Sequence, residues 1–468
     1  MARTVPSEEL NRQFDNATEV KKLLEDRFHG RTPKAFTHTY GCQGNVSDGE
    51  KMDGLLAQMG YEFTDTPAEA DFVLYNTCAV REHAEERVYG NLGRLKEYKA
   101  ANPDMIIAVC GCMAQEGHVA DRLKKSFPYV DLVFGTHVQY KLPEFLLRLL
   151  TGDSARIFDL TENDDDIAEG IALHRTNQLK AFLPISYGCN NFCTYCVVPH
   201  VRGRERSRSY DAIMAEARDL VKQGYKEIML LGQNVNSYGK DFRETDQFAR
   251  LLRDINDIPG DFIIRFMTSH PRDCSRTLLD TMADCEKVEG HLHLPFQSGN
   301  DRVLKAMNRH YNREHYLELV DYAKSVMPDL ALTSDVIVGF PGETHEEFLD
   351  TVSLVKEVGF QSLYTFIFSP RVGTPAASME DPYTREEKQQ WFEELQFAQN
   401  EKATELSRAM QGLCYRVLCE GHAKNGKLQG RTFGSIMVEF DGPDRLVGKF
   451  VNVRITEPLT YILKGELI

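Results

Sequence analysis

The chain has 468 residues and a formal net charge of −15 at pH 7. This length is enough for two to four domains, each with its own hydrophobic core. The acidic balance argues against nonspecific nucleic-acid binding over the whole surface, because affinity for phosphates comes from clustered Lys and Arg. We see no long apolar run and no signal-peptide core in the charged N-terminus. We therefore expect a cytoplasmic protein with no membrane partner, whose RNA partner, if it has one, meets a local basic face.

The chain contains eleven cysteines, an odd number. Several of them lie in segments with the pattern of buried strands. A disulfide framework is therefore not expected, and the cysteines are better explained by metal binding or catalysis.

The first 150 residues predict a leader followed by a sheet domain. Residues 1–33 are expected to be mobile or loosely packed, with one short amphipathic stretch at 20–28. From residue 34 to about 150, short apolar strands alternate with helical stretches, which is typical of a parallel sheet with crossover helices. We predict an α/β fold with an open parallel-sheet domain over residues 34–150.

Three strands of this domain end in cysteine. The predicted strands 35–40, 71–76 and 105–109 are followed by Cys42, Cys78 and the pair Cys110 and Cys112. A single buried cysteine is usually structural, but ligands of open α/β sheets lie beyond the carboxyl ends of the strands. The three positions together indicate a common three-cysteine iron–sulfur site. We prefer Cys112 to Cys110, because a residue on the strand would point away from its end and Gly111 allows close backbone approach.

A linker is predicted over residues 151–178, with a solvated acidic run at 162–166. Beyond it, the sequence CNNFCTYC at 189–196 contains three cysteines with spacings of three and two residues. Three thiolates on one tight loop can hold three irons of a cubane cluster and leave the fourth open for S-adenosylmethionine (SAM). Zinc is the main alternative, but zinc sites usually pair two CxxC halves, and the sequence has no second one.

The CxxxCxxC loop, with Tyr195 before its last cysteine, resembles the signature of the radical-SAM superfamily. Together with TYGCQ at 39–43, NTCAVR at 76–81 and GCMAQ at 111–115, it resembles the methylthiotransferase family over nearly the whole chain from residue 34. Residues 76–88 are most similar to the branch that acts on N6-isopentenyladenosine in tRNA. The resemblance implies an auxiliary 4Fe-4S cluster on one set of cysteines and a catalytic 4Fe-4S cluster on the other. The auxiliary set is Cys42, Cys78 and Cys112, and the catalytic set is Cys189, Cys193 and Cys196.

The resemblance also implies a reaction. One SAM methylates a sulfur associated with the auxiliary cluster, and a second SAM gives a radical that takes hydrogen from carbon 2 of the adenine, which the methylthio group then replaces. Turnover would need an electron donor such as flavodoxin and iron–sulfur cluster assembly or carrier proteins. The alternatives are methylthiolation of threonylcarbamoyladenosine or of a ribosomal-protein aspartate, and a non-catalytic iron–sulfur RNA-binding protein.

Residues 179–410 alternate between predicted strands and helices, which suggests a barrel, and the family's partial (βα)6 barrel fits the pattern. The strands are expected at 183–188, 227–231, 262–267, 291–295, 330–338 and 362–368. Helices are expected at 210–223, 313–326 and 344–358, and a packing helix with the only tryptophan, Trp391, at 383–410.

Barrel active sites lie at the carboxyl ends of the strands, so polar residues there are candidates for holding SAM, with Tyr195 against its adenine. The candidates are Gln233, Asn234, Ser269, Gln297, Ser298 and Asp335. Polar residues also commonly cap strands and helices, which is the structural alternative. The run GFPGE at 339–343 fits either a family element or a simple turn.

A basic run follows the cysteine loop at residues 201–208. Its arginines can bind RNA phosphates, because a guanidinium offers planar bidentate hydrogen bonds; the alternative is that some pair with the protein's own carboxylates or with that of SAM. The candidates are Arg202, Arg204, Arg206 and Arg208.

Residues 411–468 have the texture of a small β-barrel, with short strands at 414–419, 428–432, 435–440, 450–457 and 460–466. Such barrels resemble OB-type RNA binders, and this one is similar to the TRAM domain found at this position in the family. Lys424, Lys427 and Arg431 are candidates for RNA contact, although such residues are ordinary on any surface. The expected partner is the anticodon loop of tRNA, whose unpaired bases leave the stack at little cost.

Overall fold

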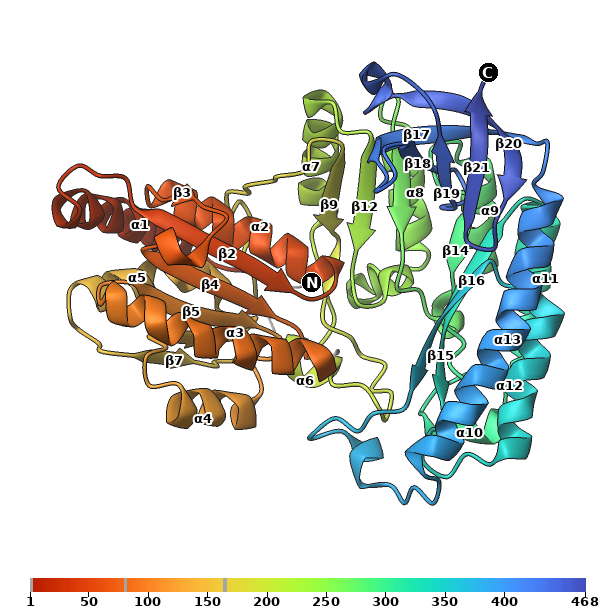
Figure 1. Ribbon diagram of the computed structural model, residues 1–468, viewed down its shortest axis with the longest axis horizontal. Helices are drawn as coiled ribbons and strands as arrows, with labels where there is room; N and C mark the ends of the chain where they lie inside the picture. The colour runs from red at the N-terminus through yellow and green to blue at the C-terminus, as the bar shows by residue number, and fades with distance from the viewer. Residues whose placement is uncertain (1–2, 80–81, 163–165) are drawn as a thin grey trace. The chain divides into compact units, whose positions relative to one another are not determined.

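The computed structural model describes residues 3–79, 82–162 and 166–468 (Figure 1). The chain forms two compact units. The first contains Met1–Asn177, Ser186–Asn190 and Val197–Ala212, and the second contains Gln178–Ile185, Asn191–Cys196 and Ile213–Ile468. Within the described ranges, no helix is long and apolar enough to cross a membrane. Val80, Arg81 and most of the predicted acidic run at 162–166 lie outside the described residues.

The first unit is built on a six-stranded sheet in the order β3-β2-β4-β5-β6-β7, in which every pair is parallel. Strands β4 and β5 are buried at every position, as expected of central strands covered on both faces. The strands are β2 Lys34–Tyr40, β3 Glu62–Phe63, β4 Phe72–Thr77, β5 Ile106–Gly111, β6 Leu132–Phe134 and β7 Ile157–Asp159. The helices between them are α2 Gln43–Gln58, α3 Glu82–Ala101, α4 Gly117–Ser126 and α5 Leu142–Leu150.

The N-terminal segment is a helix, α1 Ser7–Arg27, and the expectation of a loosely packed leader is wrong. Its buried side chains recur every three or four residues, so one stripe faces the core. Ala17, Val20 and Leu24 belong to the same hydrophobic cluster as Phe145 of α5. The sequence signal was weak because the other side chains of α1 are polar or charged except Leu10, Phe14 and Leu23.

We expect Leu24→Ala to lower the free energy of unfolding by about 3 kcal/mol, because the substitution leaves a cavity in this core. Urea denaturation followed by circular dichroism measures the change. Glu25→Ala, at the neighbouring exposed position, is the control and should change stability by no more than about 0.5 kcal/mol. Equal effects of the two variants would mean that α1 does not pack in solution as described.

The second unit contains six parallel barrel strands in two sheets, β13-β12-β9 and β14-β15-β16. A parallel bridge between Ile264 and Val288 links β13 to the segment before β14. The strands are β9 Lys180–Pro184, β12 Glu227–Leu231, β13 Ile263–Phe266, β14 His291–His293, β15 Ala331–Val338 and β16 Ser362–Ile367. The main helices are α7 Tyr210–Gln223, α8 Gln247–Asn256, α9 Arg276–Asp284, α10 Asp301–Ala306, α11 Arg313–Val326 and α12 His345–Val358.

This arrangement confirms the expected barrel of six βα units. The strand predicted at 183–188 differs, because β9 ends at Pro184 and residues Ser186–Tyr187 form a separate short strand, β10, antiparallel to β11 Arg206–Ser207. Proline has no N–H to donate to a sheet, which is consistent with the end of β9 at that residue.

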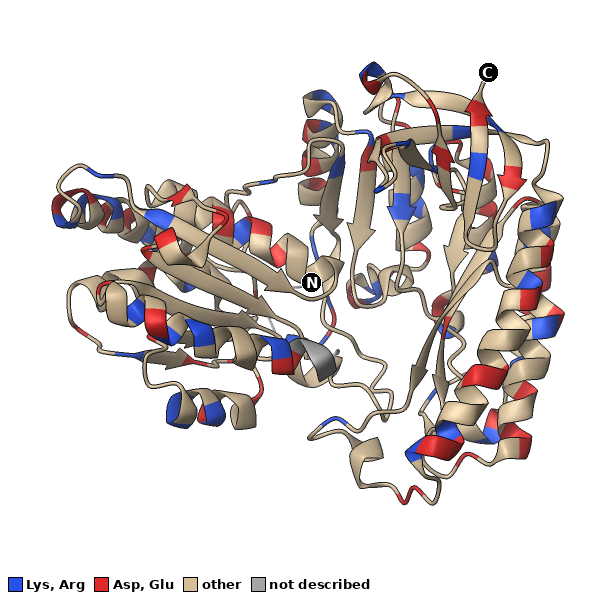
Figure 2. Cartoon of the chain, viewed as in Figure 1, with Lys and Arg blue, Asp and Glu red and all other residues tan. Residues whose placement is uncertain are grey.

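Helix α13 Arg385–Ala409 packs against α12 and β16. Trp391 is buried against Phe348 and Tyr383. Phe397, which also lies in the predicted packing helix, is 66% exposed and is not part of the core. Acidic and basic positions are interspersed along α12 and α13, so these helices form no basic stripe (Figure 2).

The chain ends in a closed five-stranded barrel with the order β17-β18-β19-β21-β20, as expected. The strands are β17 Cys414–His422, β18 Leu428–Thr432, β19 Met437–Phe440, β20 Phe450–Pro458 and β21 Ile462–Leu467. Its own core includes Val417, Val438 and Phe440.

A buried charge network connects this small barrel to the (βα)6 barrel within the second unit. Arg265 of β13 is fully buried, and its Nε donates to Glu227 Oε2 at 2.9 Å. Its Nη1 donates to Glu289 and, at 2.6 Å, to Ser435 Oγ in the β18–β19 turn. Lys180 adds a bond of 2.7 Å to Glu420 of β17. These buried charges are compensated only by one another. The network therefore holds one end of the small barrel against the (βα)6 barrel.

Candidate functional site

The first candidate site lies at the carboxyl ends of three neighbouring strands. Cys42, Cys78 and Cys112 directly follow β2, β4 and β5, and Cys78 and Cys112 are buried. A hydrogen bond from Cys78 lowers the pKa of Cys42 to about 5, helped by the charge of Arg202 and by the backbone amides of Gly44 and Asn45. Cys42 is the N-cap of α2, a position that favours the anionic thiolate, the form that binds metals.

Asn45 joins the three strand ends. It is fully buried on α2, and its Oδ1 lies 3.3 Å from Cys42 Sγ. Its Nδ2 donates to the carbonyl of Thr77 at 3.0 Å and approaches Cys112 Sγ at 3.9 Å. One amide side chain therefore contacts all three loops, and no spacing rule applied to the sequence could have identified it.

Arg202 places a positive charge beside this site. Its Nε donates to Cys112 Sγ at 3.1 Å and its Nη2 donates to Asp48 Oδ2 at 2.7 Å. The guanidinium is buried, and the pairing with Asp48 compensates for the loss of solvation. Burial raises the pKa of Cys112, and the charge and hydrogen bond of Arg202 act in the opposite direction, toward the thiolate form that binds metals.

The basic run at 201–208 is therefore not the surface patch that the sequence suggested. Arg202, Arg206 and Arg208 are buried, and only Arg204 of the four arginines is exposed. Arg206 donates to the carbonyl of Arg202 at 3.1 Å, and Arg208 binds Glu169 through two nitrogens at 2.9 and 2.7 Å. The alternative of pairing with the protein's own carboxylates holds for Arg202 and Arg208.

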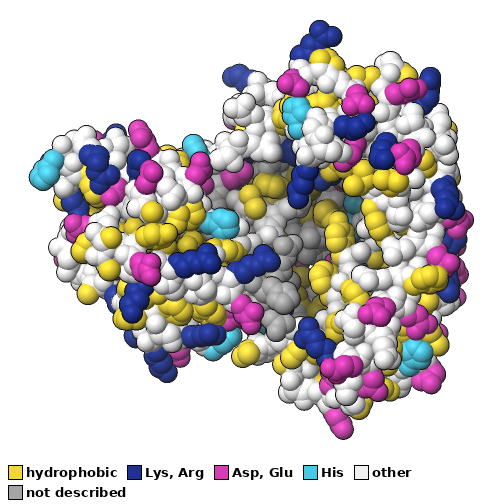
Figure 3. Space-filling view, in the orientation of Figure 1, with side chains coloured by type: hydrophobic (Ala, Val, Ile, Leu, Met, Phe, Trp, Pro, Cys, Tyr) yellow, Lys and Arg dark blue, Asp and Glu magenta, His cyan; other side chains and the backbone are white. Residues whose placement is uncertain are grey.

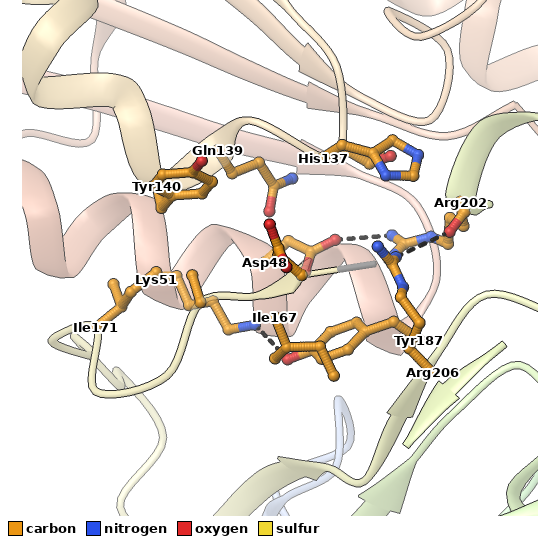
Figure 4. Close-up of a pocket in the computed structure, with 13 residues that line it drawn as sticks. Asp48, Lys51, His137, Gln139, Tyr140, Ile167, Ile171, Tyr187, Arg202 and Arg206 are labelled. Atoms are coloured by element: carbon orange, nitrogen blue, oxygen red, sulfur yellow. Dashed lines mark hydrogen bonds and ion pairs between the residues drawn. The ribbon is translucent and has the colours of Figure 1, made fainter. Parts of the chain in front are cut away.

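A cavity of about 60 Å³ adjoins this network (Figure 4). Asp48 and Arg202 line one side of it, and Lys51, whose Nζ donates to Tyr187 Oη at 2.7 Å, lines another. The charged side chains around the cavity mostly engage one another, so the cavity has the polarity and size to hold a few water molecules.

The choice of Cys112 over Cys110 agrees with the geometry. Cys110 lies on β5 itself, is fully buried in the core, and burial raises its pKa well above the ordinary value. Gly111 has a positive φ of 95°, and a Cβ there would lie 2.4 Å from the carbonyl oxygen of Thr77. The close approach of β4 therefore requires glycine at position 111. The approach of a cluster, which the sequence suggested as the reason, is not needed to explain this glycine.

The second candidate site is the CxxxCxxC loop, which passes from the first unit to the second between Asn190 and Asn191. In the second unit, residues 191–196 are fixed by main-chain contacts with the end of α10. Thr194 N donates to the carbonyl of Met307 at 3.1 Å, and Asn308 Nδ2 donates to the carbonyl of Phe192 at 2.9 Å. Hydrogen bonds to other parts of the second unit therefore help to hold this part of the loop in place.

Arg309 supplies a buried cation beside this loop. Its Nη1 lies 3.6 Å from Cys193 Sγ, and its Nη2 donates to the carbonyl of Pro295 at 2.6 Å. Each cysteine site therefore has an arginine against one thiol: Arg202 at Cys112 and Arg309 at Cys193. Arg309 was missed from the sequence because it lies 116 residues from its cysteine and in no recognisable motif.

Three of the residues predicted to hold SAM carry a buried polar atom without a hydrogen-bond partner among the described residues. They are Gln233 Oε1, Asn234 Oδ1 and Ser269 Oγ, which lie beyond the ends of β12 and β13. The two segments are adjacent, because Val235 N donates to the carbonyl of Thr268 at 3.2 Å. Such atoms are normally satisfied in native proteins by a protein group, a water molecule or a ligand, so these three atoms form a candidate polar binding site.

The other SAM candidates divide into two kinds. Gln297 and Ser298 are buried and serve local structure: the Gln297 backbone bonds to Asp335 and Ile337, and Ser298 Oγ accepts from Asn300 N. Asp335 is partly exposed on β15, with its Oδ1 3.5 Å from His293 Nε2. Tyr195 packs against the cluster formed by Val303, Met307, Phe340 and Ala376.

Glu343 is a further buried carboxyl near the end of β15, in the run GFPGE. Its Oε2 accepts from Gly339 N at 2.8 Å and Phe340 N at 3.2 Å, and its Oε1 has no partner among the described residues. Burial raises its pKa to about 7, despite those two backbone bonds. The run is thus a tight turn closed by its own glutamate.

We expect Glu343 to make stability depend on pH. Because its folded-state pKa of about 7 exceeds the ordinary value of 4.5, the protonated carboxyl stabilises the fold at low pH, and this contribution is lost as pH rises through 7. Relative to Glu343→Gln, the wild type should lose on the order of 3 kcal/mol between pH 4.5 and pH 8.5. Urea unfolding of both proteins across this range gives the difference, and parallel curves would show that Glu343 titrates normally.

The predicted RNA-binding residues of the small barrel are only partly available. Lys424 is exposed, whereas Lys427 pairs with Asp441 at 2.9 Å and Arg431 pairs with Glu420 at 3.1 Å. The Lys427–Asp441 pair lies on the surface and is weak, whereas Glu420 is largely buried and also pairs with Lys180.

Across residues 3–79, 82–162 and 166–468, no group of three His, Cys, Asp or Glu side chains is close enough to hold a single metal ion.

Comparison with known proteins agrees with this architecture. Models of three families match the chain: Radical SAM superfamily at residues 183–355, Uncharacterized protein family UPF0004 at 34–135, and TRAM domain at 408–468. The fold is similar to that of the radical S-adenosylmethionine methyltransferase TsrM from Kitasatospora setae, with a TM-score of 0.55 and 14% identity, over 74% of this chain and 75% of that one.

Relatives at much higher identity cover nearly the whole chain. The tRNA-2-methylthio-N(6)-dimethylallyladenosine synthase of Acetivibrio thermocellus is 49% identical over 99% of this chain and 97% of its own length. The proteins of the same name from Clostridium perfringens (strain 13 / Type A) and Thermoanaerobacter sp. (strain X514) are 49% and 48% identical, over 92% and 99% of this chain and 96% and 98% of their own lengths.

The partial barrel and its three-cysteine loop thus place the chain among the radical SAM enzymes, whose cofactors are SAM and 4Fe-4S clusters. Within that class it belongs to the tRNA-2-methylthio-N(6)-dimethylallyladenosine synthase family.

Proposed function

We propose that this protein converts N6-isopentenyladenosine beside the anticodon of tRNA to its 2-methylthio derivative. The observation that carries the proposal is the second set of thiols, because SAM cleavage alone needs only the CxxxCxxC loop. Cys42, Cys78 and Cys112 meet at one sheet edge with Arg202 and Asn45 around them. A separate thiolate site in a radical-SAM chain is what a sulfur-transferring enzyme requires.

The residues assigned to each group follow from the two sites. Cys189, Cys193 and Cys196 hold the catalytic 4Fe-4S cluster, and Cys42, Cys78 and Cys112 hold the auxiliary one. When bound, these groups supply the electron that cleaves SAM and the sulfur that is transferred. Arg309 and Arg202 place a buried positive charge beside Cys193 and Cys112, where it would offset the negative charge of a thiolate-held cluster.

SAM binds at the carboxyl ends of β12, β13 and β15. The unpartnered atoms of Gln233, Asn234 and Ser269 accept hydrogen bonds from its ammonium or ribose hydroxyl groups, and Asp335, within β15, offers a carboxylate. Tyr195 packs against its adenine from the loop side. Gln297 and Ser298 shape the turn that follows β14 and contribute through their backbone.

The RNA contacts that we propose are electrostatic. Arg204 and Lys424 are exposed, and Lys427 can exchange its weak surface pair with Asp441 for a phosphate. Arg431 is a weaker candidate, because it pairs with the largely buried Glu420. The cellular partners are an electron donor such as flavodoxin and cluster carrier proteins, and the protein works in the cytoplasm. We assign residues 34–150 together with Arg202 to the auxiliary cluster, the rest of 179–410 to SAM and 411–468 to RNA.

The decisive experiment is mass spectrometry of tRNA nucleosides from a strain without this protein and from the same strain with it restored. Loss and recovery of 2-methylthio-isopentenyladenosine, with accumulation of the unthiolated precursor, is the expected result. A change only in the threonylcarbamoyl nucleoside would keep the chemistry and replace the substrate. If neither nucleoside changes, tRNA is not the substrate, and methylthiolation of a ribosomal-protein aspartate becomes the next test.

A further inference from the structure

The inner face of the last barrel strands carries an unusual exposed apolar strip. Tyr364 and Phe366 on β16 are 47% and 55% exposed, although aromatic side chains on barrel strands are normally covered. Hydrophobic side chains are visible in Figure 3 over the region that β15 and β16 occupy in Figure 1. The other face of β16 packs against α13, so its exposed face is the one that points away from that helix.

The register of the sheet places this strip at the SAM candidates. Tyr364 lies opposite Asp335 of β15, and Phe366 lies opposite Ile337. In a parallel pair, residues in register stand on the same face, so the four side chains form one surface. Tyr364 also contacts the ring of His293 edge-on, with 5.7 Å between the ring centroids, and His293 faces Asp335.

Two further apolar residues are candidates for this surface. Ile337 packs against the same cluster as Tyr195 of the cysteine loop. Beyond the end of β16, Val372 is 67% exposed. A flat aromatic pair flanked by aliphatic side chains suits a purine ring carrying an aliphatic group, because unstacked bases bind by stacking on exposed aromatic side chains.

We propose that Tyr364 and Phe366 form the subsite for the modified adenine, with Tyr364 stacking on the base and Phe366, Ile337 and Val372 contacting the isopentenyl group. This inference rests on the proposed function and names the residues that select its substrate. The strip discriminates against a threonylcarbamoyl group for an electrostatic reason. That group carries a carboxylate, and of the described side chains on the strip none is a cation, whereas Asp335 is an acid at its edge. Arg431, whose charge acts on Tyr364, is paired with Glu420.

The test uses the reconstituted enzyme and three anticodon stem-loop RNAs that differ only in the target base: adenosine, isopentenyladenosine and threonylcarbamoyladenosine. Equilibrium binding by fluorescence anisotropy, without reductant, gives Kd for each RNA. We expect Tyr364→Ala to raise Kd about 5- to 100-fold for all three RNAs through loss of stacking. Phe366→Ala should raise Kd mainly for the isopentenyl RNA and reduce its preference over plain adenosine about tenfold, while Phe366→Leu should keep that preference in large part.

Phe397→Ala is the matched control, because Phe397 is a comparably exposed phenylalanine on α13. Its Kd values should equal those of the wild type. If Tyr364→Ala and Phe366→Ala behave like this control while the wild type methylthiolates the isopentenyl RNA, the subsite is wrong and the proposed function stands. If the wild type binds the isopentenyl RNA with the expected preference but produces no methylthio product, the subsite stands and the proposed function fails.

Discussion

Cys112→Ala should abolish methylthio transfer, lowering it by about 10³-fold or more, while SAM cleavage to 5′-deoxyadenosine continues. The reason is the division of the thiols into two sites: Cys112 belongs to the strand-end set, whereas the CxxxCxxC loop is held by its own contacts in the second unit. Liquid chromatography with mass spectrometry measures both products from one reaction. The iron content should fall by about the contribution of one of the two 4Fe-4S clusters.

Cys110→Ala is the matched control, because this cysteine lies two residues away on β5 and points into the core. It should retain iron and both activities, with only a small loss of stability. Cys193→Ala should show the complementary defect, with no SAM cleavage and the strand-end cluster retained. If Cys110→Ala instead of Cys112→Ala lost methylthio transfer, the assignment of the third auxiliary ligand would be reversed.

Arg265→Met should lower the free energy of unfolding of the second unit by about 3–5 kcal/mol, because it leaves two buried carboxylates without their main counter-charge. Glu227 and Glu289 are both almost fully buried and both bond to Arg265. Urea unfolding followed by the fluorescence of Trp391, the only tryptophan, reports on this unit. The substitution should also loosen the small barrel, since Arg265 bonds to Ser435 and to the carbonyl of Thr432.

Arg416→Met provides the comparison. Arg416 pairs with Asp261 on the surface, where both side chains are largely exposed, and such pairs contribute about 0–1 kcal/mol. If Arg265→Met cost no more than Arg416→Met, the buried network would not be a stabilising connection. Hydrogen exchange of β18 and β19 then shows whether the small barrel is released, because amides at a loosened junction lose protection first.

The sequence predicted those parts of the fold that depend on local pattern. Helices Tyr210–Gln223 and Arg313–Val326 and strands Glu227–Leu231 and Leu428–Thr432 lie where periodicity placed them. The strand-end cysteines were also predictable, because topology alone brings the carboxyl ends of adjacent parallel strands together. Helix α1 was missed as an ordered element because its apolar stripe is narrow.

The environment of the thiols could not be predicted, because it depends on contacts between distant residues. Arg202 meets Asp48 across 154 positions and Cys112 across 90. Nothing in the run at 201–208 distinguishes an arginine that turns inward from one that meets solvent. Of the four arginines, only Arg204 is exposed, as its charge suggested. The other three are buried against partners that are distant in the sequence or that the sequence does not reveal.

The strand-end cysteines are positioned by regular secondary structure. Cys42, Cys78 and Cys112 follow β2, β4 and β5, whose positions are fixed by a paired parallel sheet and two hydrophobic cores. Under the proposed function, the auxiliary cluster gives up sulfur during turnover and must be rebuilt on the same thiols. Because the strands before these thiols are held by the sheet and not by the cluster, rebuilding would require delivery of iron and sulfur but no rearrangement of the fold.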